Sequence, residues 1–209
     1  MWLAGKALRA LAVVCLCAAA AVSAKGREVE PASDDVRTLA AWVTGARDNQ
    51  GLPFAIVDKR AAKLYLFEPK GRVIASSAVL LGAARGDRST PGVGKLPPAQ
   101  IPWADRTTPA GRFETEPGRN LDGEDVVWFD YDAGLAIHRL RPAAPAQQRA
   151  ERLASASADA HRISAGCVVV PVAFFTGVIQ PTLGRSRGVV YVLPEMHSLR
   201  EVFAAAESF

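Results

Sequence analysis

The chain has 209 residues, of which 49% are hydrophobic and 22% charged, and its formal net charge is +4. This is an ordinary globular composition, and the length suits one domain with a proper core plus some appendages. The phosphate-binding patterns Gly-x-Gly-x-x-Gly and Walker A are absent, so nothing in the sequence indicates a nucleotide-binding domain.

Residues 1–24 have the pattern of a secretory signal peptide. Lys6 and Arg9 form a basic start, residues 11–22 are an apolar run, and the small residues up to Ala24 offer a cleavage site. The apolar run is too short for a comfortable membrane span, although an uncleaved N-terminus would associate loosely with a membrane. We therefore expect export, cleavage after Ala24 and a periplasmic location in a bacterium.

Cleavage changes both the charge and the cysteine content. It leaves 23 basic against 21 acidic residues, a net charge of +2 that carries no nucleic-acid-binding footprint. It also removes Cys15 and Cys17, so that Cys167 becomes the single cysteine. A lone exported thiol has no disulfide partner in its own chain and is at risk of oxidation, which favours a function for it. The alternative is a buried, inert thiol that packs as a small hydrophobic side chain.

The first part of the mature chain predicts a helix followed by a strand meander. Within residues 25–51, a charged linker precedes a helix that Ser33 can cap, with Asp34 and Asp35 in its first turn. Its apolar residues recur at helical spacing, so we expect one face to pack on the core. Three β-branched and aromatic runs follow at residues 54–58, 63–68 and 72–82, separated by turn residues.

Beyond residue 82, strands alternate with irregular segments. Residues 83–108 are rich in Gly, Pro and charge and predict a long surface loop. Further strands are expected at residues 107–115, 125–132, 134–140 and 188–194, and further helices at 147–153 and after Pro171. The sequence thus predicts a mainly β protein, an antiparallel and sandwich-like sheet domain over residues 52–194 with a few peripheral helices. Residues 195–209 are expected to hold a C-terminal helix, because Ser198 and Glu201 have capping-box spacing.

The turn Ser164-Ala165-Gly166-Cys167 could hold a cysteine nucleophile. Such a nucleophile needs a base that generates the thiolate, N–H groups that hold an oxyanion, and a group that orients the base. Gly166 lets the backbone approach a substrate carbonyl closely, and the N–H of Cys167 can point at it.

A histidine would have to be the base near neutral pH, and the chain has three. His138 lies in an apolar strand pattern, His161 lies six residues before the cysteine, and His197 precedes the last predicted helix. Sequence distance alone does not choose between His138 and His161.

The segments LAIHRL and RISAGCVVVP, in this order, resemble the signature of the L,D-transpeptidase catalytic domain, also called the YkuD-type domain. TTPAGRFET is similar to the Thr-Pro-x-Gly-x-Phe segment of that family, and the runs at residues 54–82 resemble its opening strands. The likeness covers residues 52–194, and on it the chain is identified as a divergent member of the family.

The resemblance implies roles for four residues. His138 would be the general base, oriented by a backbone carbonyl rather than by an acid, and Cys167 would be the nucleophile. Ser164 and Gly166 would shape the turn that forms the oxyanion site. No metal or organic cofactor is implied, and one cysteine with three scattered histidines makes a structural zinc site hard to build.

Three arginines are expected near the cleft. Peptidoglycan stem peptides carry several carboxylates, which the guanidinium groups of Arg139, Arg141 and Arg162 would bind as forks. A solvated basic surface is the alternative, and it is favoured for Arg141.

The implied activity is L,D-transpeptidation of peptidoglycan stem peptides, in cell-wall cross-linking or remodelling. Cys167 would attack the carbonyl between the third, diamino-acid residue and the terminal D-Ala of a tetrapeptide stem, and an amine would resolve the thioester. Two alternatives stay open: an L,D-carboxypeptidase, in which water resolves the thioester, and a catalytically silent cell-wall binding module. A papain-like protease is disfavoured, because there the cysteine precedes the histidine in the chain.

Three features differ from the family pattern. Ala165 stands where the family often has His or another large polar or aromatic residue, and Val169 stands where it usually has Arg or Asn. The 25 residues between His138 and Ser164 are more than usual. The extra Ala- and Gln-rich residues 142–160 predict either a lid over the site or a surface insertion.

Overall fold

The computed structural model describes residues 31–204, and the predicted signal peptide at residues 1–24 lies outside this range. The helices and strands are, in chain order, α1 (Asp34–Gly45), β1 (Phe54–Asp58), β2 (Lys63–Phe67), β3 (Val73–Ala78), β4 (Leu81–Gly82), β5 (Gly111–Arg119), β6 (Asp125–Asp130), β7 (Leu135–Arg139), α2 (Arg149–Ala154), β8 (Arg162–Ser164), β9 (Val168–Val170), α3 (Val172–Phe174), β10 (Gly188–Val192) and α4 (Leu199–Val202). Within this part of the chain, no helix is long and apolar enough to cross a membrane.

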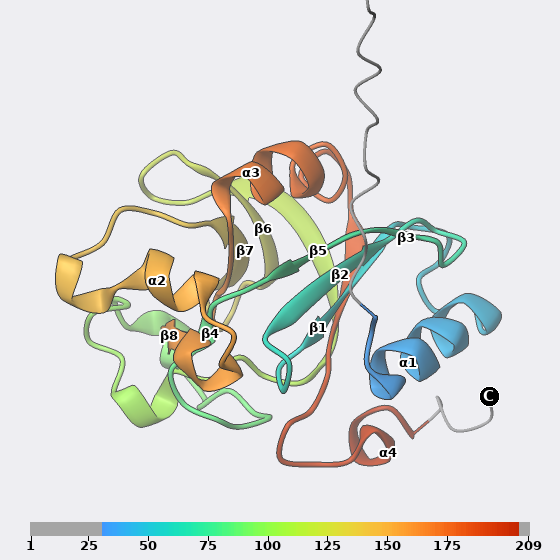
Figure 1. Ribbon diagram of the computed structural model, residues 1–209, viewed down its shortest axis with the longest axis horizontal. Helices are drawn as coiled ribbons and strands as arrows, with labels where there is room; N and C mark the ends of the chain where they lie inside the picture. Colours follow the sequence, from blue (N-terminus) through green and yellow to red (C-terminus); the bar gives the residue numbers. More distant parts are fainter. Residues whose placement is uncertain (1–30, 205–209) are drawn as a thin grey trace, which may run out of the picture.

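Eight strands form one curved sheet in the order β3-β2-β1-β10-β5-β6-β7-β9 (Figure 1). The pairs β1·β10 and β7·β9 are parallel, and the other neighbours in this sheet are antiparallel. β4 and β8 form a second, parallel pair. The mainly β prediction is confirmed, with the correction that the sheet is mixed. Turn signals indicate antiparallel neighbours, whereas the parallel pairs join strands that no short turn connects.

The inner strands are buried on both faces because alternate side chains enter two different cores. Phe54 and Ile56 of β1 pack with residues of α1 and with Phe203 just after α4 on one side of the sheet. Ala55 and Val57 join the main core, which also contains side chains of β6, β7, β9 and α3. The two ends of the sheet approach each other, because Leu80, just after β3, forms a bridge with Val169 of β9. Figure 1 shows α1 and α4 on the side away from α2.

Several local predictions are confirmed. Ser33 caps α1 by accepting the N–H of Val36. α4 begins with the predicted capping box between Ser198 and Glu201. Residues 83–108 form a loop with two short 3₁₀ turns, tied to itself by a bridge between Ala84 and Thr107. The expected helix after Pro171 is one turn of α-helix that continues as a π-helical stretch, Phe175–Ile179.

Candidate active site

Cys167 and His138 lie on the same face of two neighbouring strands. β7 and β9 run parallel, with His138 opposite Val169. Cys167 directly precedes β9 and therefore lies opposite Ala136, two residues before His138 and on the same face of the sheet. Such diagonal neighbours are within reach of each other's longer side chains. The sheet thus brings together the two residues that the sequence marks as nucleophile and base.

The turn before Cys167 is built by Ser164 and Gly166. The Ser164 hydroxyl accepts the N–H of Gly166 at 3.0 Å and donates to the carbonyl of Cys167 at 2.7 Å. Gly166 has φ +126°, and a Cβ there would lie 2.7 Å from both a Leu135 methyl group and the Thr107 carbonyl oxygen. Only glycine fits this turn. Within residues 31–204 the N–H of Cys167 has no hydrogen-bond acceptor, which leaves it free for an oxyanion.

Thr108 braces the same turn from the other side, and the sequence did not mark it as part of the site. Its hydroxyl donates to the carbonyl of Gly166 at 2.8 Å and accepts the N–H of Gly82 at 2.9 Å. The side chain is fully buried. Thr108 belongs to the TTPAGRFET segment, so the family likeness of that segment was the available signal, but it gave no contact partner.

His138 is a neutral imidazole with one nitrogen fixed. Its ring is 9% exposed, and Nδ1 lies 2.8 Å from the carbonyl oxygen of Arg139. A carbonyl oxygen can only accept, so Nδ1 carries the proton and Nε2 keeps its lone pair. Burial lowers the pKa of His138 to about 4, and the positive charges of Arg141 and Arg149 contribute in the same direction. The ring is therefore neutral at pH 7.

The Cys167 thiol is half-buried and protonated at rest. Its Sγ lies 3.8 Å from the carbonyl oxygen of Gly134, which a thiol can reach only as a weak donor. Burial raises the pKa of the thiol, and the Ala136 N–H and the charges of Arg141 and Arg149 offset part of this rise. Among the described residues, no hydrogen bond joins the thiol to His138, so the two groups are neighbours rather than an ion pair.

The other two histidines have partners elsewhere. His161 is 3% exposed, and its Nδ1 and Nε2 lie 2.8 and 3.0 Å from the carbonyl oxygens of Val79 and Ser155. Both ring nitrogens thus face backbone carbonyl oxygens rather than the Cys167 thiol. His197 Nδ1 pairs with Asp87 at 2.8 Å.

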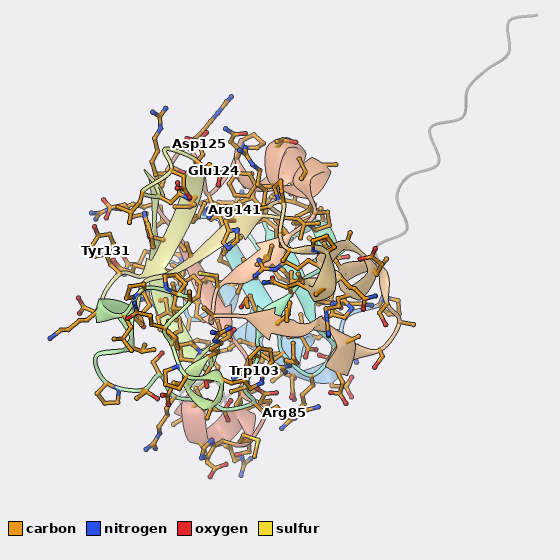
Figure 2. All side chains as sticks on the ribbon, turned by 90° about the vertical axis from the view of Figure 1, so that its left-hand side faces the viewer. Arg85, Trp103, Glu124, Asp125, Tyr131 and Arg141 are labelled. Atoms are coloured by element: carbon orange, nitrogen blue, oxygen red, sulfur yellow. The ribbon has the colours of Figure 1, made fainter. Side chains whose placement is uncertain are left out.

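The predicted substrate-binding arginines occupy two different places. The Arg139 Nη2 lies 2.7 Å from one carboxylate oxygen of Glu124, and the Arg141 Nε lies 2.5 Å from the other. Figure 2 shows Glu124 and Arg141 side by side on the face that carries α2. Arg162, in contrast, directs its guanidinium to Glu195 and to the carbonyl of Lys59, and its side chain is only 8% exposed. This leaves Arg162 no free fork for a substrate carboxylate.

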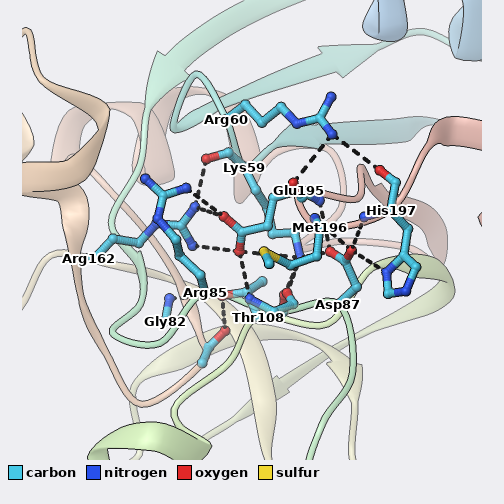
Figure 3. A network of polar contacts seen from close by, with 12 residues as sticks. Lys59, Arg60, Gly82, Arg85, Asp87, Thr108, Arg162, Glu195, Met196 and His197 are labelled. Atoms are coloured by element: carbon cyan, nitrogen blue, oxygen red, sulfur yellow. Dashed lines mark hydrogen bonds and ion pairs between the residues drawn. The ribbon is translucent and has the colours of Figure 1, made fainter.

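A buried charge network links this region to the cysteine turn (Figure 3). Lys59 is fully buried, and its ammonium donates to Asp87 at 2.7 Å and to the carbonyl of Thr108 at 2.9 Å. Burial disfavours the charged form of Asp87, yet hydrogen bonds from Lys59, Glu195 and His197 hold its pKa well below the usual range. The ammonium thus fixes the backbone of Thr108, whose hydroxyl holds the turn.

Residues 142–160 cover the face that carries the thiol. Leu153 of α2 packs against Val169 and Leu80 in a small buried cluster. Val169 is the residue that stands where the family usually has a polar side chain, and here it is fully buried. Val169 thus supplies the buried apolar surface on which Leu153 of the insertion packs.

No group of three or more His, Cys, Asp or Glu side chains that could hold a metal ion occurs in residues 31–204.

No protein-family model matches the sequence, and no curated protein matches it. Among solved structures, the chain is similar to the L,D-transpeptidase of Xylanimonas cellulosilytica, with 17% identity over 68% of this chain and 60% of that chain and a TM-score of 0.41. It is similar to the catalytic domain of the Enterococcus faecium L,D-transpeptidase, with 18% identity over 68% and 98% and a TM-score of 0.36.

It is also similar to the helical cell shape determining protein Pgp2 of Campylobacter jejuni, with 15% identity over 74% of this chain and 55% of that chain and a TM-score of 0.45. The chain spans about half to three fifths of the length of the longer L,D-transpeptidase chains, 49–60%. Identities and TM-scores of this size assign no role to any residue of this chain.

Proposed function

We propose that this chain is an exported cysteine acyltransferase of the L,D-transpeptidase kind that acts on peptidoglycan stem peptides. The observation that carries the proposal is the pairing of a neutral, carbonyl-oriented His138 with Cys167 on one sheet face. Residues 52–194 would be the catalytic domain, and residues 1–24 would direct it to the periplasm. The family resemblance of the two segments supplies the substrate.

The proposed first half-reaction starts from two uncharged groups. A rotation of the Cys167 side chain away from the Gly134 carbonyl brings the thiol to Nε2 of His138, which takes the proton as sulfur attacks. The attacked carbonyl lies between the third residue and the terminal D-Ala of a tetrapeptide stem. The tetrahedral oxyanion accepts the free N–H of Cys167, on a turn held rigid by Ser164 and Thr108.

The second half-reaction returns the enzyme to its resting state. His138 gives its proton to the leaving D-Ala amine as the C–N bond breaks, and a thioester remains. The amine of an acceptor then attacks the thioester and passes a proton to Nε2, the C–S bond breaks, and the thiolate is reprotonated. Transfer to a second stem would serve cell-wall cross-linking or remodelling.

The test is to incubate the protein without residues 1–24 with a disaccharide-tetrapeptide and to follow the products by mass spectrometry. We expect a cross-linked dimer with loss of one D-Ala, and no product from Cys167→Ser. A tripeptide without dimer would instead assign an L,D-carboxypeptidase. If no turnover occurs and a carbapenem forms no adduct with Cys167, the enzyme proposal is wrong and a silent binding module remains.

A further inference from the structure

A groove beside α2 has arginines in its lining. It has a volume of about 350 Å³ and lies between residues 140–145, which follow β7, and residues 148–151. Its walls are mostly small apolar side chains and prolines, Arg141 and Arg149 supply positive charge, and Glu151 is the one acidic residue that the groove's lining contains. Leu153 packs on Val169, so the helix that carries Arg149 is held over the sheet face that carries the thiol.

Arg149 and Arg106 carry charge that the described residues do not neutralise. Within residues 31–204 neither forms an ion pair. The Nε of Arg149 donates to the Gln147 side-chain oxygen at 2.7 Å, and the Nε of Arg106 donates to the Ile101 carbonyl at 2.9 Å. Both guanidinium groups are thus oriented through Nε, and their terminal nitrogens have no protein acceptor in this part of the chain. Such a fork is ready for a planar anion.

The charges of Arg149, Arg141 and Arg106 affect one another. Arg141 and Arg149 line the same groove, and Arg106 directly precedes Thr107, whose carbonyl lies against Gly166 of the cysteine turn. In keeping with this arrangement, burial lowers the pKa of Arg149, and the charges of Arg141 and Arg106 lower it further. Arg141 shares the single carboxylate of Glu124 with Arg139, which leaves this end of the site with excess positive charge. The Arg106 guanidinium lies 5.3 Å from the centre of the Trp103 ring.

We propose that Arg149, with Arg106 and Arg141, forms a carboxylate-binding subsite beside Cys167 that takes an acidic group of the peptide substrate. The helix of the insertion thereby supplies a cation near the thiol, while Val169 of β9 has become a packing residue. The identity of the peptide rests on the proposed function, whereas anion binding beside the thiol does not.

Two alkylating reagents test this without any peptide. Iodoacetate and iodoacetamide both form a bond from the thiolate sulfur to their CH₂ carbon while iodide leaves with the electron pair. Both rates therefore depend in the same way on the amount of thiolate. The ratio of the two rates then reports whether the site attracts or repels an anionic reagent. We expect the iodoacetate-to-iodoacetamide ratio of Cys167 to exceed that of 2-mercaptoethanol under the same conditions. Arg149→Gln should lower the ratio about three- to tenfold, as expected for one nearby, partly screened charge.

Two further variants separate charge from structure. Arg149→Lys keeps the charge and should keep most of the ratio. Arg187→Gln removes an exposed arginine that pairs with Glu116 of β5 and does not line the groove, and it should leave the ratio unchanged.

Three results would overturn the subsite: a wild-type ratio equal to that of 2-mercaptoethanol, an unchanged ratio in Arg149→Gln, or a thiol that neither reagent reaches. If the ratio falls as expected in Arg149→Gln and stem peptides are still not turned over, the proposed function fails and the subsite stands.

Discussion

At the scale of single residues, the proposed nucleophile and base are both uncharged at rest, and their surroundings explain why. His138 is nine-tenths buried under α2, beside two arginines, so its charged form is disfavoured. The thiol of Cys167 is shielded in the same place. A pair of this kind reacts by general-base catalysis from the neutral state, rather than from a preformed thiolate–imidazolium pair.

The first prediction concerns the pH dependence of the reaction. The proposed base is the neutral ring of His138, which predominates above its pKa of about 4, so kcat/KM should fall only as the pH drops through about 4. An unperturbed histidine would give this loss near pH 6.5. Because Arg149 helps to lower this pKa, Arg149→Gln should move the acid limb to higher pH. An acid limb at 6.5 in the wild-type profile would contradict a buried, neutral His138.

The second prediction concerns the turn that presents the thiol. Gly166→Ala adds a Cβ at φ +126° that meets the Thr107 carbonyl at 2.7 Å, so it combines backbone strain with a steric clash. We expect a loss of about 3 kcal/mol in unfolding free energy and of nearly all activity. Gly123→Ala is the matched control, because Gly123 has φ +75° with nothing within 4 Å of its Cβ position. It should cost about 1 kcal/mol and keep activity. Equal effects in chemical denaturation would show that no clash occurs at Gly166.

At the scale of the elements, α2 packs on β9 through side chains that are distant in the sequence. Leu153 of α2, Val169 of β9 and Leu80 bury one another on the face that carries Cys167. The His161 ring bridges this cluster, with one nitrogen facing the Val79 carbonyl and the other facing the Ser155 carbonyl at the end of α2. Apolar packing of Leu153 and polar contacts of His161 thus both hold the insertion in place, which favours a fixed cover over a freely moving lid.

The third prediction follows from this fastening. Leu153→Ala removes the apolar anchor of α2, and we expect it to lower the unfolding free energy by about 2 kcal/mol. Amide hydrogen exchange in residues 149–154 should accelerate more than exchange in the β1–β2 hairpin, because the anchor is local. Leu121→Ala makes the same substitution at a fully exposed site and should change neither quantity. If exchange accelerates equally throughout the domain, α2 is not a separable unit.

The elements also show what could be predicted from the sequence and why the rest could not. The Ser33 cap and the hairpin between β6 and β7 rest on signals within a few residues, and both occur in the structure. The β1·β10 and β7·β9 pairings, in contrast, join distant segments and leave no local pattern. Arg162 was expected near the cleft as a fork for substrate carboxylates, but its guanidinium binds Glu195, which comes 33 residues later in the chain. Arg149 gave no signal at all, since only the folded insertion brings it near the thiol.

At the scale of the whole molecule, one buried lysine connects the start of the sheet with the cysteine turn. Lys59 follows β1, and its ammonium binds Asp87 of the long loop and the carbonyl of Thr108. Asp87 in turn accepts the N–H groups of residues 195–197, so the segment before α4 joins the same network. A buried ion pair of this kind is weak evidence for stability, but its geometry restricts how these segments can sit together. The network is connected to the candidate site through Thr108, whose carbonyl accepts from Lys59 and whose hydroxyl donates to the Gly166 carbonyl.

The last prediction compares two buried threonines that differ in their hydrogen bonds. Thr108→Val removes the donor to the Gly166 carbonyl and the acceptor for the Gly82 N–H, and it leaves both backbone groups buried without a partner. We expect a loss of about 2–3 kcal/mol in unfolding free energy, and a fall in kcat larger than any change in KM, because the Cys167 N–H loses its fixed direction. Thr115→Val is the control, since the Thr115 hydroxyl is buried and has no hydrogen-bond partner within residues 31–204, so valine there should be neutral or stabilising. Equal denaturation midpoints for the two variants, with wild-type kcat in both, would show that Thr108 only fills space and that the turn holds its shape without it.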